Sequence, residues 1–266
     1  MSYTIIKCGG SVLDQLPESF YENIVQMAQS YDINPIIVHG GGPHISDYLQ
    51  RLNVDVEFVG GMRVTTEETL DITELVLSGL VNKKIVRNLN KAGGTAYGLS
   101  GVDGMLLEAE EMKPGQHLGY VGKIIAVNTD RLKAITAQQI IPVLSPLSAD
   151  RYGQRWNINA DLAAAAIAIR LDAPLYMVSN ISGVMDSGKL VNQLDKGKAE
   201  EMVSDGSIFG GMIPKVQAAF DCVQQGVKKV VILNGLAKDS IPDVIAGKRV
   251  GTVIGENEMM EIQKGG

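Results

Sequence analysis

The strongest constraint on the fold is a strand, a helix and a second strand near the N-terminus, with glycines soon after each strand. Residues 3–7 and 35–38 are short runs rich in isoleucine and valine, which is typical of buried strands. Between them, Phe20, Ile24 and Met27 recur at the spacing of one helical face. This order predicts a βαβ unit with parallel strands, and therefore an α/β fold.

The rest of the chain continues the alternation. Thr65 and Glu68 have the spacing of a capping box and predict a long helix that runs toward residue 90 and stops near Gly93. Short strands and turn signals between about residues 96 and 146 predict a β-rich insertion or lid. Further helices are expected at 161–170, 212–225 and 241–246, and further strands at 175–179, 230–233 and 251–254.

Composition limits the kinds of function. The chain has 266 residues, of which 45% are hydrophobic, and its net charge of −6 argues against a general nucleic-acid or anionic-membrane surface. Any anion site must then be a local pocket of lysine, arginine and backbone N–H groups. Two cysteines are too few for a disulfide framework, no secretory leader opens the chain, and no apolar run reaches the roughly 20 residues that span a bilayer. We expect a cytoplasmic protein.

Glycine-rich turns after two strands are candidate phosphate sites. Lys7 ends the first strand and precedes Gly9 and Gly10, so its ammonium and the backbone N–H groups could approach the same phosphate oxygens. An ordinary strand-ending lysine is the alternative. Three glycines, 40–42, follow the second strand and precede Pro43, which suits a first helical turn. A close-packed strand-to-helix turn is the alternative there.

Charged and amide side chains at other predicted element ends are further candidates. Arg63 follows a glycine turn and is suited to bidentate capture of a carboxylate, although a surface arginine is the alternative. Asn157, Asn159 and Asp161 lie at the start of an alanine-rich helix, where Asp161 could simply be an N-cap. Lys215 lies in a first helical turn, where a cation opposes the macrodipole, so an anionic ligand explains it more readily.

Other motifs are weaker. Residues 183–189 match a phosphate-binding P-loop except that Leu190 replaces the final Ser or Thr, and we interpret the segment as a turn. The glycines at 40–42 lack the third glycine of a dinucleotide fingerprint. His44 and His117 have no ligand partners at metal spacing, so no metal site is expected, and His39 is interpreted as a structural hydrogen-bonding residue.

Taken in order, these motifs resemble the acetylglutamate kinases of the amino-acid kinase family. The resemblance covers nearly the whole chain through KCGG, VHGGG, GGMRVT, GLSGVDG, LGYVG, NINAD, GGMIPK and a terminal GT. It implies a three-layer open αβα sandwich around a mainly parallel sheet of about eight strands. It also implies a homodimer that transfers the γ-phosphate of ATP, with Mg²⁺ held by phosphate oxygens and water, to the γ-carboxylate of N-acetyl-L-glutamate in arginine biosynthesis.

The resemblance also implies roles for individual residues. Lys7 and Lys215 would neutralise charge on the transferring phosphoryl group, and Asp161 would orient both lysines. Residues that would bind the acyl-amino acid are Gly41, Gly42, Arg63, Asn157 and Asn159. Residues that would hold the nucleotide are Gly9, Gly10, Ser179, Asn180, Ser182, Gly183, Val184, Gly210, Gly211 and Met212. Residues 1–172 would form the acid-binding and dimerisation lobe, and residues 173–266 the nucleotide-binding lobe, with a hinge near residues 171–173.

The chain departs from the family pattern in places. Asn180 stands where many relatives have Asp, which leaves nucleotide preference open, and Cys8 replaces a larger residue. Only six residues precede Lys7, so we expect the dimeric, arginine-insensitive kind of enzyme and not a hexamer. Two alternatives remain: a sister kinase for another acid, such as N-acetylaminoadipate, and a weakly catalytic sensor of amino acids or nucleotides.

Overall fold

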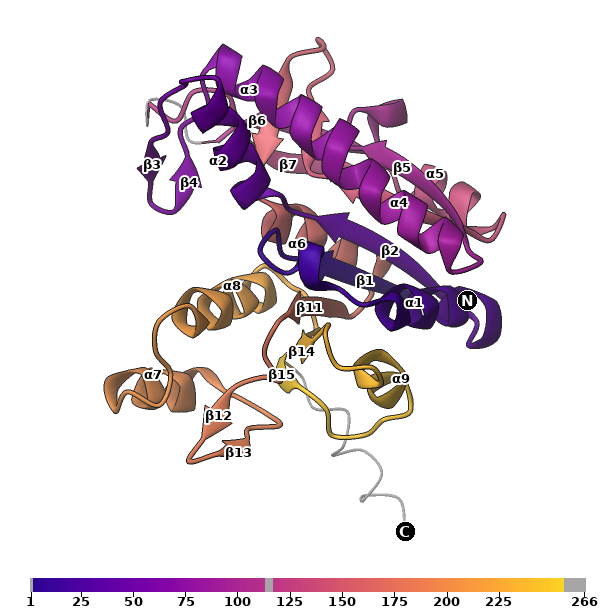
Figure 1. Cartoon of the computed structure of the whole chain (residues 1–266), viewed down its shortest axis with the longest axis vertical. Coiled ribbons are helices and arrows are strands. Elements are labelled where there is room, and N and C mark those ends of the chain that lie inside the picture. The colour runs from indigo at the N-terminus through magenta and orange to yellow at the C-terminus, as the bar shows by residue number, and fades with distance from the viewer. Residues whose placement is uncertain (1, 113–116, 256–266) are drawn as a thin grey trace.

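The protein is a three-layer αβα sandwich in a computed structural model that describes residues 2–112 and 117–255 (Figure 1). Its central sheet has seven strands in the order β15-β14-β11-β1-β2-β8-β5. All neighbours are parallel except β14 and β15. The strands are β1 Ser2–Cys8, β2 Ile33–His39, β5 Thr95–Ser100, β8 Ile140–Ser145, β11 Leu175–Ser179, β14 Lys229–Asn234 and β15 Thr252–Gly255. The predicted fold class is confirmed, with seven strands in the described sheet where about eight were expected.

Alternation along the strands sends side chains into two separate cores. In β1, Ile5 packs into one core and Ile6 into the other, and both side chains are fully buried. Helices on the first face are α5 Thr129–Thr136, α6 Ala160–Leu171, α7 Lys196–Ser204 and α8 Met212–Gln224. Those on the second face are α1 Glu18–Ser30, α2 Gly42–Arg51, α3 Glu67–Glu74, α4 Asn82–Lys91 and α9 Ser240–Ile245. No helix among the described residues is both long and apolar enough to cross a membrane.

The helix over residues 67–91 contains an irregular segment that the sequence did not predict. Seven residues, Leu75–Val81, form the π-helix η2 between α3 and α4. The helix ends near Gly93, as expected, but its N-cap is Thr66, whose hydroxyl accepts a hydrogen bond from the Thr69 N–H. The expected capping box at Thr65 is wrong by one residue, because the Thr65 hydroxyl is buried and instead donates to the Arg63 carbonyl at 2.9 Å.

The β-rich insertion is smaller than expected. Strands β5 and β8 and helix α5 lie within residues 96–146 but belong to the sandwich, because β5 pairs along its whole length with β8. Strands β6 Leu107–Glu111 and β7 Val121–Val127 form a small closed barrel together with β9 Leu147–Ala149 and β10 Arg155–Ile158. Two short hairpins are also present: β3 Phe58–Val59 with β4 Met62–Arg63, and β12 Met185–Asp186 with β13 Lys189–Leu190. Short 3-10 turns lie at Leu13–Gln15 and Asp103–Met105.

Candidate active site

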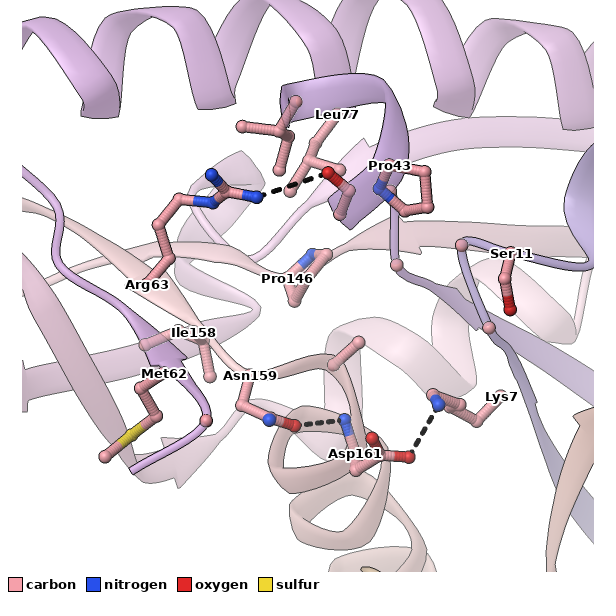
Figure 2. A pocket seen from close by; sticks show the side chains of 18 of the residues that line it. Lys7, Ser11, Pro43, Met62, Arg63, Leu77, Pro146, Ile158, Asn159 and Asp161 are labelled. Atoms are coloured by element: carbon pink, nitrogen blue, oxygen red, sulfur yellow. Dashed lines mark hydrogen bonds and ion pairs between the residues drawn. The ribbon is translucent and has the colours of Figure 1, made fainter. Parts of the chain in front are cut away.

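A cavity of about 410 Å³ opens at the carboxyl ends of the central parallel strands (Figure 2). This is where open α/β sheets bind ligands. Lys7 and Ser179 reach it from the neighbouring strands β1 and β11. Helix α6 and the small barrel contribute Asp161 and Asn157, and the β3-β4 hairpin contributes Arg63. Segments far apart in the sequence therefore converge on one cavity.

Lys7 and Asp161 form an ion pair inside this cavity. The Lys7 Nζ lies 2.7 Å from Asp161 Oδ1. The two groups form an ion pair, but their relative orientation does not meet the geometry of a hydrogen bond. Asp161 is free to make it because Asn159 is the N-cap of α6, and its Oδ1 accepts the Asp161 N–H at 2.7 Å. The alternative reading of Asp161 as the cap is therefore wrong. Both side chains are only partly exposed, at 15% and 22%.

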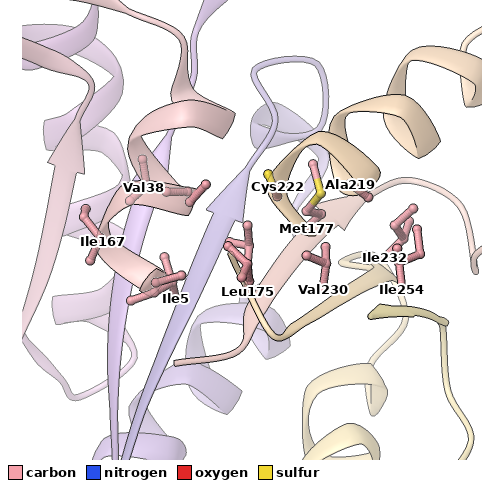
Figure 3. Packing of buried hydrophobic residues seen from close by; sticks show 14 of the residues in the cluster. Ile5, Val38, Ile167, Leu175, Met177, Ala219, Cys222, Val230, Ile232 and Ile254 are labelled. Atoms are coloured by element: carbon pink, nitrogen blue, oxygen red, sulfur yellow. The ribbon is translucent and has the colours of Figure 1, made fainter. Parts of the chain in front are cut away.

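The helices that carry these groups are fixed by packing on the sheet (Figure 3). Helix α6 presents buried alanines to the strands, and such small side chains allow a close approach of helix and sheet. Ala219 and Cys222 anchor α8 in the same core. Burial raises the pKa of Cys222, and that of Cys8, to about 12, so neither thiol is ionised at neutral pH.

Lys215, in the first turn of α8, lines the cavity and a second one of about 730 Å³. Its Nζ lies 3.5 Å from Asn180 Oδ1, and no carboxylate pairs with it in the described part of the chain. Burial lowers its pKa, and the nearby Lys7 ammonium lowers it further. Asp161 thus pairs with Lys7, while Lys215 has an amide as its neighbour, so an anion between the two lysines would be strongly favoured.

The two glycine-rich loops touch one another beside the lysines. The Gly40 N–H donates to the Cys8 carbonyl at 2.9 Å, which joins the ends of β1 and β2. A side chain on Gly10 would come within 2.9 Å of the Gly41 nitrogen, so this close approach requires glycine. The N–H groups of Gly41 and Gly42, at the start of α2, have no acceptor among the described residues. They are donors available to an anion.

Arg63 provides a buried positive charge next to the glycines. It is 8% exposed, and its Nη2 donates to the Gly42 carbonyl at 3.2 Å and to the Ser46 hydroxyl at 2.8 Å. Its guanidinium carbon lies 4.7 Å from the centre of the Phe58 ring. The Nη1 group is buried without a partner, and no described carboxylate pairs with the side chain. Burial lowers its pKa, but a guanidinium remains charged.

Asn157 is held by a residue that sequence reasoning missed. Its Nδ2 donates to the Thr65 hydroxyl at 3.0 Å. The Thr65 backbone pairs with Leu118 and Tyr120, which docks the barrel onto the chain next to Arg63. Gly119 has φ +67 and a side chain there would meet the Thr65 oxygen at 2.1 Å. The glycine in LGYVG was the available signal for this contact.

The proposed nucleotide residues divide between the two cavities. Gly9, Gly10 and Ser179 line the first, and Asn180, Ser182, Gly183, Val184, Gly211 and Met212 line the second. Gly210 lies at the turn into α8, with φ +54, and lines neither. Phe209 and Asn234, which were not predicted, also line the second cavity. The near P-loop at 183–189 includes the β12-β13 hairpin turn, so its interpretation as a turn is confirmed.

His39 and His44 contact other residues of the protein. His39 is fully buried, and burial lowers its pKa to about 4, so the ring is neutral at physiological pH. This confirms its interpretation as a structural hydrogen-bonding residue. His44 Nε2 lies 3.0 Å from Asp14 Oδ2. Within residues 2–112 and 117–255 no group of three or more histidines, cysteines and carboxylates could hold a metal ion.

Comparison with known proteins places the chain among the kinases of small molecules. Residues 2–234 match the amino acid kinase family. A protein from Oceanobacillus iheyensis named acetylglutamate kinase is 45% identical over 266 residues, which cover 98% of this chain and 100% of the relative. One of the same name from Geobacillus thermodenitrificans is 47% identical, over 87% of this chain and 89% of the relative.

Solved structures share the fold. The smu.665 protein of Streptococcus mutans UA159 is 26% identical, with a TM-score of 0.78 and coverage of 96% of this chain and 99% of that one. Carbamate kinase from Giardia lamblia is 13% identical, with a TM-score of 0.68 and coverage of 96% and 99%, which is a likeness of fold alone. On the family match and the identity to full-length relatives, the chain belongs to the amino acid kinase family.

Proposed function

We propose that this protein is an acetylglutamate kinase, which transfers the γ-phosphate of ATP to the γ-carboxylate of N-acetyl-L-glutamate. The main support for the proposal is the convergence of three cationic side chains on one cavity. Arg63 is a buried cation with no carboxylate partner among the described residues, and Lys7 and Lys215 are cations in the same cavity. A dicarboxylate that is N-acylated has one anionic group for Arg63 and a second to place beside the lysines.

The acceptor chemistry suits this cavity. A γ-carboxylate with a pKa of about 4.3 is ionised at neutral pH, so its attack on phosphorus needs no general base. His39 is neutral but fully buried and does not line the cavity, so it is no candidate for one. What the reaction needs is relief of the repulsion between two anions, which the lysines and the Gly41 and Gly42 N–H groups can supply.

The nucleotide would occupy the second cavity, with its phosphates directed at Lys215. Lys215 lines both cavities and is therefore the group that can contact an oxygen on either side of the transferring phosphoryl. Asp161 would orient Lys7, with which it pairs, while Asn180 would orient Lys215. This revises the expectation that Asp161 orients both lysines.

Magnesium would accompany the ATP. Asp161 is the single carboxylate among the residues that line the first cavity, and it is paired with Lys7, so phosphate oxygens and water would hold the ion. When bound, Mg²⁺ would neutralise charge on the phosphates. The chain's own contribution remains the placing of its lysines, glycine N–H groups and Arg63.

The names of the relatives support the same activity, which places the protein in arginine biosynthesis.

A homodimer is part of the proposal. Leu75 is 71% exposed and Leu80 is 42% exposed on the π-helix η2, and Tyr97 is 51% exposed on the edge strand β5. Large apolar side chains exposed on neighbouring elements suit an interface with a second copy.

An ADP-release assay tests the activity. Purified protein with Mg-ATP is given N-acetyl-L-glutamate, L-glutamate, aspartate or N-acetylaminoadipate, each at several concentrations. We expect kcat/KM for N-acetyl-L-glutamate to exceed that for every other acid by at least about tenfold. Faster turnover of N-acetylaminoadipate would identify a sister kinase, and binding without turnover would identify a sensor.

A further inference from the structure

Two buried polar side chains lie directly behind the glycine loop of the active site. His39 and Asn82 are both fully buried. The His39 Nδ1 lies 3.0 Å from the Gly40 carbonyl oxygen, and its Nε2 lies 3.2 Å from Asn82 Nδ2. Neither residue lines the cavity, whereas Gly40 and Gly41 do. The pair therefore acts on the cavity wall from its far side.

The contacts of His39 allow one arrangement of its proton. A backbone carbonyl only accepts hydrogen bonds, so the Nδ1 must carry the hydrogen that the Gly40 oxygen accepts. The ring is neutral, so the Nε2 then has a lone pair, which suits the Asn82 amide as donor. The same amide nitrogen lies 2.8 Å from the Val143 carbonyl and 3.2 Å from the Leu99 carbonyl, so its two hydrogens are shared among three acceptors. Its oxygen accepts from Lys83 Nζ at 3.1 Å. The orientation of Asn82 is thus fixed by neighbours on two strands and its own helix.

This arrangement fixes a peptide bond of the active site. The Gly40 carbonyl and the Gly41 N–H belong to one peptide, and no described peptide is cis, so the two groups point in opposite directions. Because the oxygen is bonded to the buried His39 ring, the Gly41 N–H faces the side of the cavity. The peptide that joins two glycines would otherwise rotate easily, since glycine backbones adopt a wide range of conformations.

The π-helix η2 positions two residues near this peptide, Leu77 within the helix and Asn82 directly after it. The Asn82 N–H bonds to the Leu77 carbonyl, five residues earlier, which brings both side chains to the inner face of the helix. A side chain on Gly41 would meet Leu77 Cδ2 at 2.5 Å, so Leu77 covers one face of the glycine. The irregular helical turn therefore contacts the loop directly through Leu77, and it reaches the Gly40 carbonyl through Asn82 and the His39 ring.

We propose that Asn82 and His39 are positioning residues that hold the Gly40–Gly41 peptide with its N–H directed at the anionic oxygens of the reacting groups. The inference rests on the proposed function for the identity of those oxygens. Loss of the carbonyl contact lets the peptide rotate and withdraws one donor from the transition state. This loss should lower kcat more than it changes KM, because charge on these oxygens is redistributed during transfer.

Two substitutions at His39 separate the contacts. In His39→Asn the amide nitrogen takes the place of Nδ1 and can still donate to Gly40, while in His39→Gln the amide takes the place of Nε2 and reaches only Asn82. The asparagine side chain is one methylene shorter than the glutamine side chain, so melting temperatures of the two variants are measured to separate a loss of stability from a loss of turnover. We expect kcat of His39→Asn to stay within about threefold of the wild type and kcat of His39→Gln to fall at least about tenfold. Equal kcat values in the two variants would overturn the proposal.

A second measurement needs no variant and no turnover. The chain has three histidines, so ¹⁵N NMR of the imidazole rings can assign His39 directly. We expect a neutral ring with the hydrogen on Nδ1 at pH 7. A hydrogen on Nε2 would overturn the proposal even if the enzyme phosphorylates N-acetyl-L-glutamate. Conversely, failure to turn over that acid would contradict the proposed function and leave the tautomer result unaffected.

Discussion

Arg63 holds a positive charge in a place that disfavours it. A buried cation without an anionic partner destabilises a folded protein, and burial already lowers the pKa of this group. The Phe58 ring and two neutral oxygens compensate only in part. An anionic ligand that fills the cavity would complete its coordination, which explains why the guanidinium is placed there.

Replacing Arg63 by methionine should therefore act on the acid substrate. We expect KM for N-acetyl-L-glutamate to rise about tenfold to a hundredfold, the loss of a hydrogen bond between charged groups, while KM for ATP changes by less than about threefold. Arg51→Met, at an exposed arginine paired with Asp47, is the control and should change neither constant. A selective rise in KM for ATP would show that Arg63 belongs to the nucleotide site.

Lys215 should show opposite effects on turnover and stability. In Lys215→Met we expect kcat to fall by about two to three orders of magnitude, because the ammonium stabilises charge in the transition state. The pKa of Lys215 is lowered in the folded protein by burial and by Lys7, so below that pKa the charged form destabilises the fold.

The sign of the stability effect follows from that pKa. Between the lowered folded pKa and the unfolded value near 10.4, the unfolded chain binds more protons, so the wild type gains stability as pH rises. At neutral pH we expect Lys215→Met to melt at a higher temperature than the wild type, and the difference should shrink at alkaline pH. Lys198→Met, at an exposed lysine of α7, should change neither property. An unchanged kcat would remove Lys215 from the mechanism.

At the scale of elements, the start of α6 combines two tasks in neighbouring residues. Asn159 caps the helix, and Asp161 is left to pair with Lys7. Asn159→Ala should lower the free energy of unfolding by about 1 kcal/mol, as the loss of an N-cap does. Asp161→Asn should leave the cap intact and lower kcat by at least about tenfold, because Lys7 loses its orienting charge. Denaturant unfolding and steady-state kinetics on both variants check this, and the reverse pattern would contradict it.

Sequence periodicity predicted most elements of this fold but not their exact pairing. The alternation of residues 3–39 predicted β1, α1 and β2 correctly, because a local pattern defines each one. Membership of β5 and β8 in the main sheet depends on contacts with each other and with β2, which no local pattern contains. The cap at Thr66 and the π-helix were missed for the same reason. The Thr65 hydroxyl is hydrogen-bonded to the Arg63 carbonyl, and the Leu77 side chain in the π-helix packs against Gly41.

The candidate site was more predictable than the contacts that support it. Lys7, Arg63 and Lys215 could be found because each lies near glycines at the end of a strand, after a turn or at the start of a helix, where a charged side chain is conspicuous. The contacts of Thr65 with Asn157 and of Asn82 with His39 could not, because the two partners of each contact lie on distant segments. Phe209 of the second cavity also had no sequence signal.

At the scale of the whole molecule, one sheet joins both proposed lobes. Strands β1 and β11 pair from Ile5 with Leu175 to Cys8 with Val178, so the expected boundary near residue 172 crosses the sheet without interrupting it. Lys7 comes from the first proposed lobe and Lys215 from the second. Both lobes must therefore contribute to the reaction, and closure would exclude water from the acyl phosphate.

Closure should need both substrates. We expect the radius of gyration, measured by small-angle X-ray scattering, to decrease when a non-hydrolysable ATP analogue and N-acetyl-L-glutamate are present together, and less with either alone. Each ligand at a hundred times its dissociation constant should also add about 2.7 kcal/mol to the free energy of unfolding. An unchanged radius with both ligands bound would show that the described arrangement is already closed.

Phosphoryl transfer to a carboxylate is tested by trapping its product, an acyl phosphate. Mg-ATP, N-acetyl-L-glutamate and hydroxylamine are incubated with the wild type and with Lys215→Met, and the hydroxamate and ADP are measured together. We expect one hydroxamate for each ADP with the wild type and a rate lower by about two to three orders of magnitude with the variant. ADP release without hydroxamate, or equal rates in the two proteins, would contradict transfer to a carboxylate at the Lys7 and Lys215 centre.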